Sequence, residues 1–128
     1  MKLPFVDHVG ICVEEHRDGL SRCTLSIEDL HFNSASIVHG GVLFTLADTA
    51  MGSALYPTLG ADQGCATIET KINFFKPVVA GAVVCTAEIV SKGKTVANLE
   101  ACVYAGEVLV AKANGTFAIF RRKDVPAT

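Results

Sequence analysis

The sequence predicts an α+β fold in which a curved antiparallel sheet wraps around one long central helix. A single apolar stretch near residues 40–55 is long enough for that helix. Segments in which hydrophobic and polar residues alternate lie on both sides of it, as expected of strands. The connections between these segments are short enough for hairpins, which favours antiparallel pairing.

The chain has the size and composition of one globular domain. It holds 128 residues, of which 50% are hydrophobic and 19% are charged, and this length is near the common size for a single core. Neither a repeat nor a linker interrupts it. We therefore expect one domain over residues 1–128, with a loose leader at residues 1–5, in which Leu3-Pro4-Phe5 can be helical, and a loose tail at residues 122–128.

The predicted central helix presents two different faces. Apolar residues recur with helical spacing on one face, at Leu43, Leu46, Ala47, Ala50 and Ala54. Small or polar residues recur on a second face, at Gly41, Thr45, Asp48 and Gly52. A carboxylate on such a face can approach a ligand or a neighbouring chain, so Asp48 is a candidate functional residue.

Two alternating segments precede the helix and four follow it. We predict strands at Val9–Glu15, Leu20–Leu30, Cys65–Phe75, Gly81–Ser91, Thr95–Tyr104 and Val108–Phe120. The last four are expected to form a meander, with a bulge or bend at Asn114-Gly115. Alternation in the first of these four places Thr67 on the face that it shares with Glu69 and Lys71.

Charge, hydropathy and cysteine usage exclude several classes of protein. The net charge is −2 and the 11 basic residues form no run beyond residues 121–123, so nucleic acid is not an expected partner. No uncharged apolar segment reaches the roughly 18 to 20 residues of a membrane span, and no signal-peptide pattern opens the chain. The cysteines are odd in number and lack a paired metal spacing, at Cys12, Cys23, Cys65, Cys85 and Cys102. We predict a cytoplasmic protein with reduced, mostly buried cysteines and no bound metal.

His39, Gly40 and Gly41 stand directly before the predicted helix. The first backbone N–H groups of a helix have no intrahelical partner and carry partial positive charge. Glycines leave these donors uncovered, which can stabilise a carbonyl oxygen that gains negative charge. The same residues are also typical of a tight turn entering a core helix. Asn33, six residues before His39, has two similar interpretations: its amide donates to that carbonyl, or it closes a turn.

The spacing between Gly41 and Asp48 makes a specific demand. Asp48 lies seven residues after Gly41, so the two are separated by roughly 10 Å along the helix axis. One carbonyl group therefore cannot touch both the glycine amides and Asp48 of the same helix. If both act on one substrate, we predict a homodimer with two antiparallel helices side by side. Each helix then gives its N-terminus to one site and its Asp48 to the other.

The segment from His39 to Asp48 resembles the motif of the PaaI-like branch of the hotdog-fold acyl-CoA thioesterases. His39-Gly40-Gly41 is followed, after an apolar gap, by Leu46-Ala47-Asp48, with the aspartate nine residues after the histidine. Asn33 also precedes His39 at the family's distance. The resemblance implies that the predicted curved sheet and central helix form a hotdog fold.

Two later segments extend this resemblance. Ile72–Pro77, with the sequence INFFKP, is similar to the family's strand that ends in an aromatic residue, a basic residue and proline. Lys92-Gly93-Lys94 is similar to a Gly-Lys hairpin that follows it in the family. The similarity covers residues 5–120, so the motif is far more specific than a His-Gly-Gly turn alone.

The family pattern implies roles for the residues of the motif. Asp48 is expected to act as the general base or the nucleophile of thioester hydrolysis. The amide of Gly40 or Gly41, together with Asn33, is expected to polarise the thioester carbonyl from the opposite subunit. His39 is expected to hold the loop or the asparagine in place.

Thr67 matches the Ser or Thr that places the attacking water in the family. A threonine in a strand is also ordinary, because β-branched residues suit strands. Coenzyme A carries phosphates, so a cationic mouth is expected, with candidates at Lys92, Lys94, Lys76 and Arg121 or Arg122. The acyl pocket is expected at Met51, Leu55 and Phe74, residues that equally suit a plain core.

The predicted function is hydrolysis of small aryl- or acyl-CoA thioesters by a metal-free and cofactor-free cytoplasmic enzyme, which the resemblance implies is a homodimer that often pairs into a homotetramer. The chemistry is plausible because a carboxylate, a positioned water and an oxyanion site suffice for an activated thioester. One alternative is a hydratase or dehydratase on the same fold, which needs a His and an acid converging on one substrate. Another is a non-catalytic acyl-CoA sensor or partner-binding module, which has no need of a base.

Overall fold

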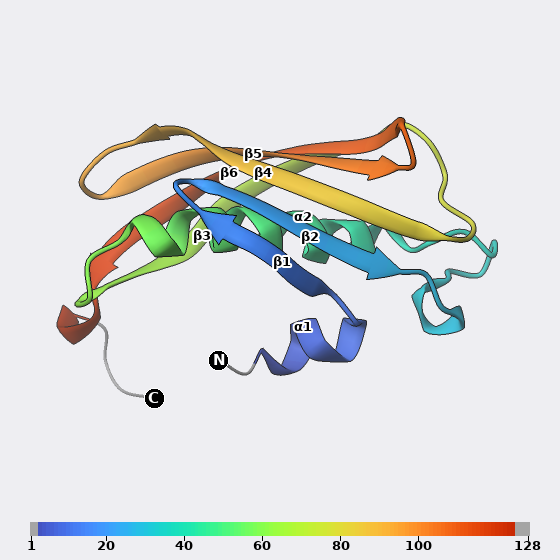
Figure 1. Ribbon diagram of the computed structural model, residues 1–128, viewed down its shortest axis with the longest axis horizontal. Helices are drawn as coiled ribbons and strands as arrows, with labels where there is room; N and C mark the ends of the chain where they lie inside the picture. Colours follow the sequence, from blue (N-terminus) through green and yellow to red (C-terminus); the bar gives the residue numbers. More distant parts are fainter. Residues whose placement is uncertain (1–2, 125–128) are drawn as a thin grey trace.

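One antiparallel sheet of six strands curves around a single long helix in the computed structural model, which describes residues 3–124 (Figure 1). The helices are α1 (Pro4–Val9) and α2 (Gly40–Leu55), with short 3-10 turns η1 (Asp29–His31), η2 (Tyr56–Thr58) and η3 (Arg122–Asp124). The strands are β1 (Cys12–Arg17), β2 (Leu20–Ser26), β3 (Gln63–Phe74), β4 (Ala82–Lys92), β5 (Val96–Ala105) and β6 (Val108–Arg121). The predicted α+β class, with a curved sheet around one central helix, is confirmed.

The first segments of the chain differ from their prediction. Pro4 opens α1, where its missing N–H costs no hydrogen bond, so a helix begins within the predicted leader, where the sequence allowed one. Gly10 ends this helix in a left-handed conformation (φ 96°), and β1 begins only at Cys12. Strand β2 ends at Ser26 because η1 occupies the next segment. The predicted leader residues 1–2 and tail residues 125–128 lie outside the described residues.

The four strands after α2 do not form a simple meander. The sheet order is β1-β2-β4-β5-β6-β3, so β4, β5 and β6 are neighbours in sequence order, whereas β3 pairs with β6. The segment 75–81 between β3 and β4 is longer than a hairpin turn and carries the chain to the other side of the sheet, where β4 joins β2. As a result, β3 is an edge strand.

A bulge in β3 corrects the predicted face of Thr67. The register with β6 shifts between Thr67 and Glu69, which leaves Ile68 outside the regular alternation. Thr67 pairs with the buried Phe117, and Thr67 therefore faces the helix together with Thr70. Simple alternation fails here because one inserted residue exchanges the two faces of a strand.

The irregularity predicted at Asn114-Gly115 is absent, since both residues pair in regular register with β3 and β5. Gly115 has a different reason to be glycine. A Cβ atom there would lie 2.9 Å from Cε of Met51, closer than side-chain atoms approach one another. The glycine thus lets the sheet pass directly over the central helix.

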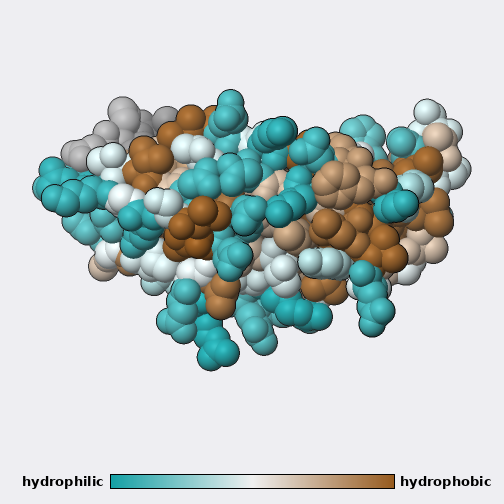
Figure 2. Space-filling view, turned by 90° about the horizontal axis from the view of Figure 1, so that it is seen from above, coloured by the Kyte–Doolittle hydropathy of each residue, from teal (hydrophilic) through white to brown (hydrophobic). Residues whose placement is uncertain are grey.

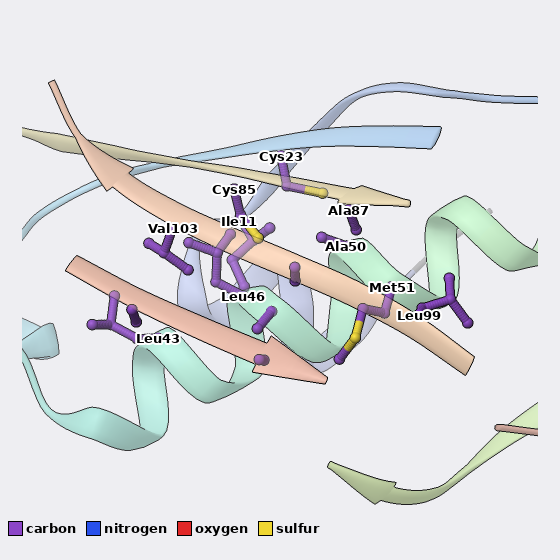
Figure 3. Close-up of a cluster of buried hydrophobic side chains, with 14 of the residues drawn as sticks. Ile11, Cys23, Leu43, Leu46, Ala50, Met51, Cys85, Ala87, Leu99 and Val103 are labelled. Carbon is purple, nitrogen blue, oxygen red and sulfur yellow. The ribbon is translucent and has the colours of Figure 1, made fainter. Parts of the chain in front are cut away.

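The hydrophobic core lies between α2 and the concave face of the sheet (Figure 3). All five residues of the predicted apolar helix face are at most 3% exposed, which confirms that prediction. Ser21 of β2 donates a hydrogen bond of 2.5 Å to the carbonyl oxygen of Ala50, so a buried polar group also joins sheet and helix. Figure 2, in which the molecule of Figure 1 is seen from above, shows hydrophilic and hydrophobic side chains interspersed over the outer surface on that side.

The cysteines are all unpaired thiols. Cys23 and Cys85 face each other on β2 and β4 and are fully buried, and burial raises the pKa of Cys23 to about 12. Cys12 is exposed, so the expectation of mostly buried cysteines does not extend to it. In the part of the chain that the structure describes, no helix is both long and apolar enough to cross a membrane. Within residues 3–124, no group of three or more His, Cys, Asp or Glu side chains is placed to hold a metal ion.

Candidate active site

His39 is the residue at which α2 begins. Its backbone is extended (φ −59°, ψ 134°), and its ring atom Nδ1 accepts a hydrogen bond of 2.8 Å from the N–H of Gly41. The backbone N–H of His39 donates to the carbonyl oxygen of His31 at 2.8 Å. The side chain therefore caps the helix and fixes the position at which the chain enters it. Because Nδ1 accepts, the ring proton of a neutral His39 resides on Nε2.

The two glycines after His39 differ in what their amides do. The N–H of Gly41 is occupied by the His39 ring. The N–H of Gly40, at the first position of the helix, has no partner among residues 3–124. A Cβ at Gly40 would lie 3.1 Å from Cζ of Phe74, so the aromatic ring already occupies the space that a side chain would need. Gly40 thus contributes an uncovered donor at the positive end of the helix.

Asn33 closes the loop that leads to His39. Its side-chain oxygen accepts hydrogen bonds from the N–H groups of Ala35 (2.9 Å) and Ile37 (3.1 Å), so the turn interpretation is correct. The side chain is exposed, and its NH₂ group has no partner in the described part of the chain. The same residue can therefore close the turn with its oxygen and still donate with its nitrogen.

Asp48 lies in the middle of α2, where it is half-buried and faces β3. The hydroxyl of Thr67 donates a hydrogen bond of 2.8 Å to Oδ1 of Asp48. Cys65, two residues earlier on the same face of β3, is half-buried beside this pair. Burial raises the pKa of its thiol, and the nearby charge of Asp48 raises it further, whereas Arg122 lowers it. The bulge that turns Thr67 toward the helix therefore creates an oriented carboxylate.

The structure keeps Gly40 and Asp48 apart within one chain. They are eight residues apart on a continuous helix, which corresponds to about 12 Å. Strand β3 runs antiparallel to α2, so that Phe74 lies at the Gly40 end and Thr67 at the Asp48 end (Figure 1). The Gly40 N–H and the Asp48 carboxylate, which are expected to act on one thioester, are thus on the same helix but too far apart to reach one carbonyl group.

The residues predicted to bind substrate are found in three different settings. Met51 and Leu55 are fully buried in the core. Lys92 donates a hydrogen bond of 2.9 Å to the carbonyl oxygen of Thr58, and Lys94 is exposed in the turn after β4. The assignment of these four residues to substrate binding remains a prediction.

Phe74 is 51% exposed and lines a cavity of about 360 Å³ at the N-terminus of α2. We name this cavity the Phe74 pocket. Its wall includes Ile37, Val38, Gly40, Leu43, Phe75 and Lys76. The predicted acyl pocket did not include Ile37, Leu43 or Phe75, although the doubled phenylalanine of the INFFKP segment was a usable signal.

Known proteins resemble this chain in sequence and in fold. The family model of the thioesterase superfamily matches residues 35–112. A protein of Saccharolobus solfataricus that is provisionally named an esterase is 34% identical over 117 residues, which cover 91% of this chain and 77% of that protein. Acyl-coenzyme A thioesterase 13 of Mus musculus is 33% identical over 76 residues, or 59% of this chain and 54% of the mouse protein.

A solved structure supports the same relationship. A variant of the phenylacetic acid degradation protein PaaI from Thermus thermophilus superimposes with a TM-score of 0.84 at 25% identity, over 90% of this chain and 97% of that one. The chain therefore belongs to the thioesterase superfamily, as a PaaI-like thioester hydrolase with a hotdog fold.

Proposed function

We propose that this protein hydrolyses small aryl- or acyl-CoA thioesters at a site that two copies of the chain share, with Asp48 as the general base or nucleophile. The observation that carries the proposal is the geometry of α2: an oriented carboxylate and an uncovered backbone donor lie on one helix, about 12 Å apart. One thioester reaches both only if they come from different helices. The acyl-CoA class is supported by the mouse relative's name and by the resemblance of the motif.

In the proposed reaction, the N–H of Gly40 and the NH₂ of Asn33 in one copy receive the thioester carbonyl oxygen. Asp48 of the second copy takes a proton from a water molecule, and the water oxygen attacks the thioester carbon. The carbon–sulfur bond then breaks, and the proton passes to the departing thiolate, which leaves as coenzyme A. If Asp48 acts as the nucleophile, it forms a mixed anhydride that water hydrolyses in a second step.

Thr67, His39 and Gly41 have supporting roles in this proposal. The single proton of the Thr67 hydroxyl points to Asp48, so Thr67 orients the carboxylate and can accept a hydrogen bond from the attacking water. The His39 ring occupies the N–H of Gly41, which favours Gly40 over Gly41 as the donor to the substrate. Lys94, which is exposed, and Lys92 are proposed to attract the phosphates of coenzyme A.

The edge strand β3 supports a dimer of the required geometry. One side of this 12-residue strand pairs with β6, and the other side has no partner within the described chain. Ile68 on this strand is 60% exposed, and Phe44 of α2 is 37% exposed. Two copies that pair their β3 edges in antiparallel fashion would continue the sheet and cover these side chains. The two α2 helices would then lie side by side and antiparallel.

Two further proposals concern assembly and location. The family resemblance alone suggests that such dimers pair into a homotetramer, and a measurement of the particle mass in solution tests this assembly. A cytoplasmic location is proposed because the five cysteines are unpaired thiols, as is usual in a reducing compartment.

Mixing two inactive variants tests the shared site directly. Asp48→Asn removes the carboxylate, and Gly40→Pro removes the backbone donor. If each site takes one group from each copy, a mixed dimer contains one intact site, so dissociation and reassociation of an equal mixture should restore about a quarter of wild-type thiol release. Mixed dimers without recovered activity would contradict the shared site, because sites confined to one chain stay broken in every combination.

The same assay separates the alternative functions. Wild-type protein is expected to release thiol from acyl-CoAs. Hydration of crotonyl-CoA without thiol release would identify a hydratase, and tight acyl-CoA binding with no turnover would identify a sensor.

A further inference from the structure

His31 is a buried histidine that takes no part in the proposed reaction. It lies in η1 and is 0% exposed, whereas His8, His16 and His39 are exposed. Burying a polar side chain is unfavourable unless its polar atoms are hydrogen-bonded. The partners of the two ring nitrogens therefore indicate what His31 does in the molecule.

The His31 ring joins two segments that are far apart in the chain. Its Nδ1 atom accepts a hydrogen bond of 2.9 Å from the backbone N–H of Glu28, in the same turn. Because Nδ1 accepts, the ring proton of a neutral His31 resides on Nε2. Nε2 lies 2.6 Å from the carbonyl oxygen of Val9 and donates to it. Since Val9 is the last residue of α1, the ring fastens η1 to the N-terminal helix.

The backbone of His31 continues this connection to the start of α2. Its carbonyl oxygen accepts a hydrogen bond of 2.8 Å from the N–H of His39. The ring of His39 in turn accepts from the N–H of Gly41, and Gly40 lies between these two residues. His31, which is fixed through its side chain, thus holds the backbone of the residue that caps α2.

The loop between His31 and His39 keeps its shape through a bridge between Phe32 and Val38. A bond within a loop fixes its form but not its place in the molecule. That place depends on bonds to other elements, from Val38 to the carbonyl oxygen of Val78 at 2.8 Å and from the His31 ring to α1. Of these bonds, the one from His31 is made by a side chain, so a substitution can remove it.

The place of the Gly40 N–H matters more for the rate of the proposed reaction than for substrate binding. Negative charge on the carbonyl oxygen grows as water attacks, so a displaced donor weakens the transition state more than the bound substrate. A displacement of about 1 Å can lower a rate by about 10²-fold.

We propose that His31 is a positioning residue, which holds the Gly40 N–H in place through its own carbonyl oxygen and His39 without touching the substrate. The effect on catalysis rests on the proposed function, whereas the positioning is a property of the free protein. The neutral ring with its proton on Nε2 is the form that does this. A proton on Nδ1 would face the N–H of Glu28, and two donors cannot bond to each other.

The first experiment measures kcat and KM for an acyl-CoA that wild type hydrolyses. His31→Leu removes both ring bonds, so kcat per folded molecule should fall about 10-fold, with KM within about 2-fold of wild type. The matched control is Ser21→Ala, which removes another buried bond to a backbone carbonyl, that of Ala50, and should keep kcat. Urea denaturation gives the folded fraction of each variant. Unchanged kcat in His31→Leu, or an equal loss in both variants, would overturn the proposal.

The second experiment follows amide hydrogen exchange without substrate. The N–H of His39 should exchange about 10-fold faster in His31→Leu than in wild type, because its acceptor is no longer held. The N–H of Ile119, which donates to the carbonyl oxygen of Thr95 at 2.8 Å, should keep its rate once the rates are corrected for global stability. Unchanged exchange at His39 would overturn the proposal.

The third experiment uses wild-type protein, so it decides the proposal even if His31→Leu fails to fold. Ring ¹⁵N shifts should identify the neutral Nε2–H form of His31, and a coupling across the hydrogen bond should connect Nδ1 with the backbone nitrogen of Glu28. A proton on Nδ1, or no such coupling, would overturn the proposal. Absence of thiol release from every acyl-CoA would instead refute the thioesterase function, while exchange and the ring signals still decide whether His31 holds this segment.

Discussion

Gly40, at the start of α2, and Asp48, in its middle, supply chemical groups in different ways. At Asp48 the group is a side chain, and a second side chain, Thr67, orients it with a hydrogen bond of 2.8 Å. At Gly40 the group is a backbone N–H that no side chain of its own residue covers, whereas the next amide, that of Gly41, is occupied by the His39 ring. A carboxylate is removed by one conservative substitution, but a backbone donor is removed only by proline.

Strand β3 supports both ends by different means. A bulge near Ile68 turns Thr67 toward Asp48. At the end of the strand, the ring of Phe74 covers the Cα of Gly40 and forms part of the adjoining pocket. Four substitutions test the roles of Asp48, Gly40 and the side chains that support them.

The largest effect is expected from Asp48→Asn. It keeps the shape of the side chain but removes its ability to accept a proton, so kcat should fall by about 10² to 10⁴ with little change in KM. Steady-state thiol release measures both constants. Asp7→Asn, at an exposed position of α1, serves as the control and should retain activity. A loss below 10-fold in Asp48→Asn would mean that Asp48 does not take part in the chemical step.

Gly40→Pro should lower kcat by about 10² relative to Gly40→Ala, because only proline removes the donor. Both substitutions introduce the same Cβ contact with Phe74, at 3.1 Å in the present structure, so alanine controls for that contact. Proline suits the first position of a helix, and the extended ψ of 134° at His39 is compatible with a following proline. Equal activities of the two variants would show that the Gly40 N–H does not act on the substrate.

Thr67→Val should reduce kcat by about 10-fold, since the carboxylate loses the hydrogen bond that orients it. Thr67→Ser keeps the hydroxyl and should recover most of the activity. Thr86→Val on the outer face of β4 is a matched change at an exposed strand position and should have no effect. Wild-type activity in Thr67→Val would show that the hydroxyl of Thr67 does not assist the reaction.

The smallest effect is expected from His39→Ala. Loss of the helix cap should lower the free energy of unfolding by about 1 kcal/mol in urea denaturation. His39→Asn should restore it, because asparagine is a strong N-cap residue. Unchanged stability in His39→Ala would indicate that water satisfies the Gly41 N–H as well as the ring does.

Much of the candidate site could be predicted because its motif is local. Helical spacing alone placed Leu46, Ala50 and Asp48 on their faces, and a continuous helix makes the distance from Gly40 to Asp48 a matter of counting residues. The demand for two copies followed from that distance and stays a prediction. The role of Thr67 came from the resemblance, because simple alternation assigned it to the wrong face of β3.

Patterns in the sequence predict the central helix, its apolar face and the order of strands along the chain, since each depends on interactions within a few residues or on a repeating pattern. They do not predict that β3 lies at the edge of the sheet beside β6, that its bulge brings Thr67 to Asp48, or that Phe74 covers Gly40. The last two contacts join residues 19 and 34 positions apart in the chain, and their geometry depends on strand pairing and on how closely the sheet packs against α2. No local pattern encodes such distances, because they result from the packing of the whole core.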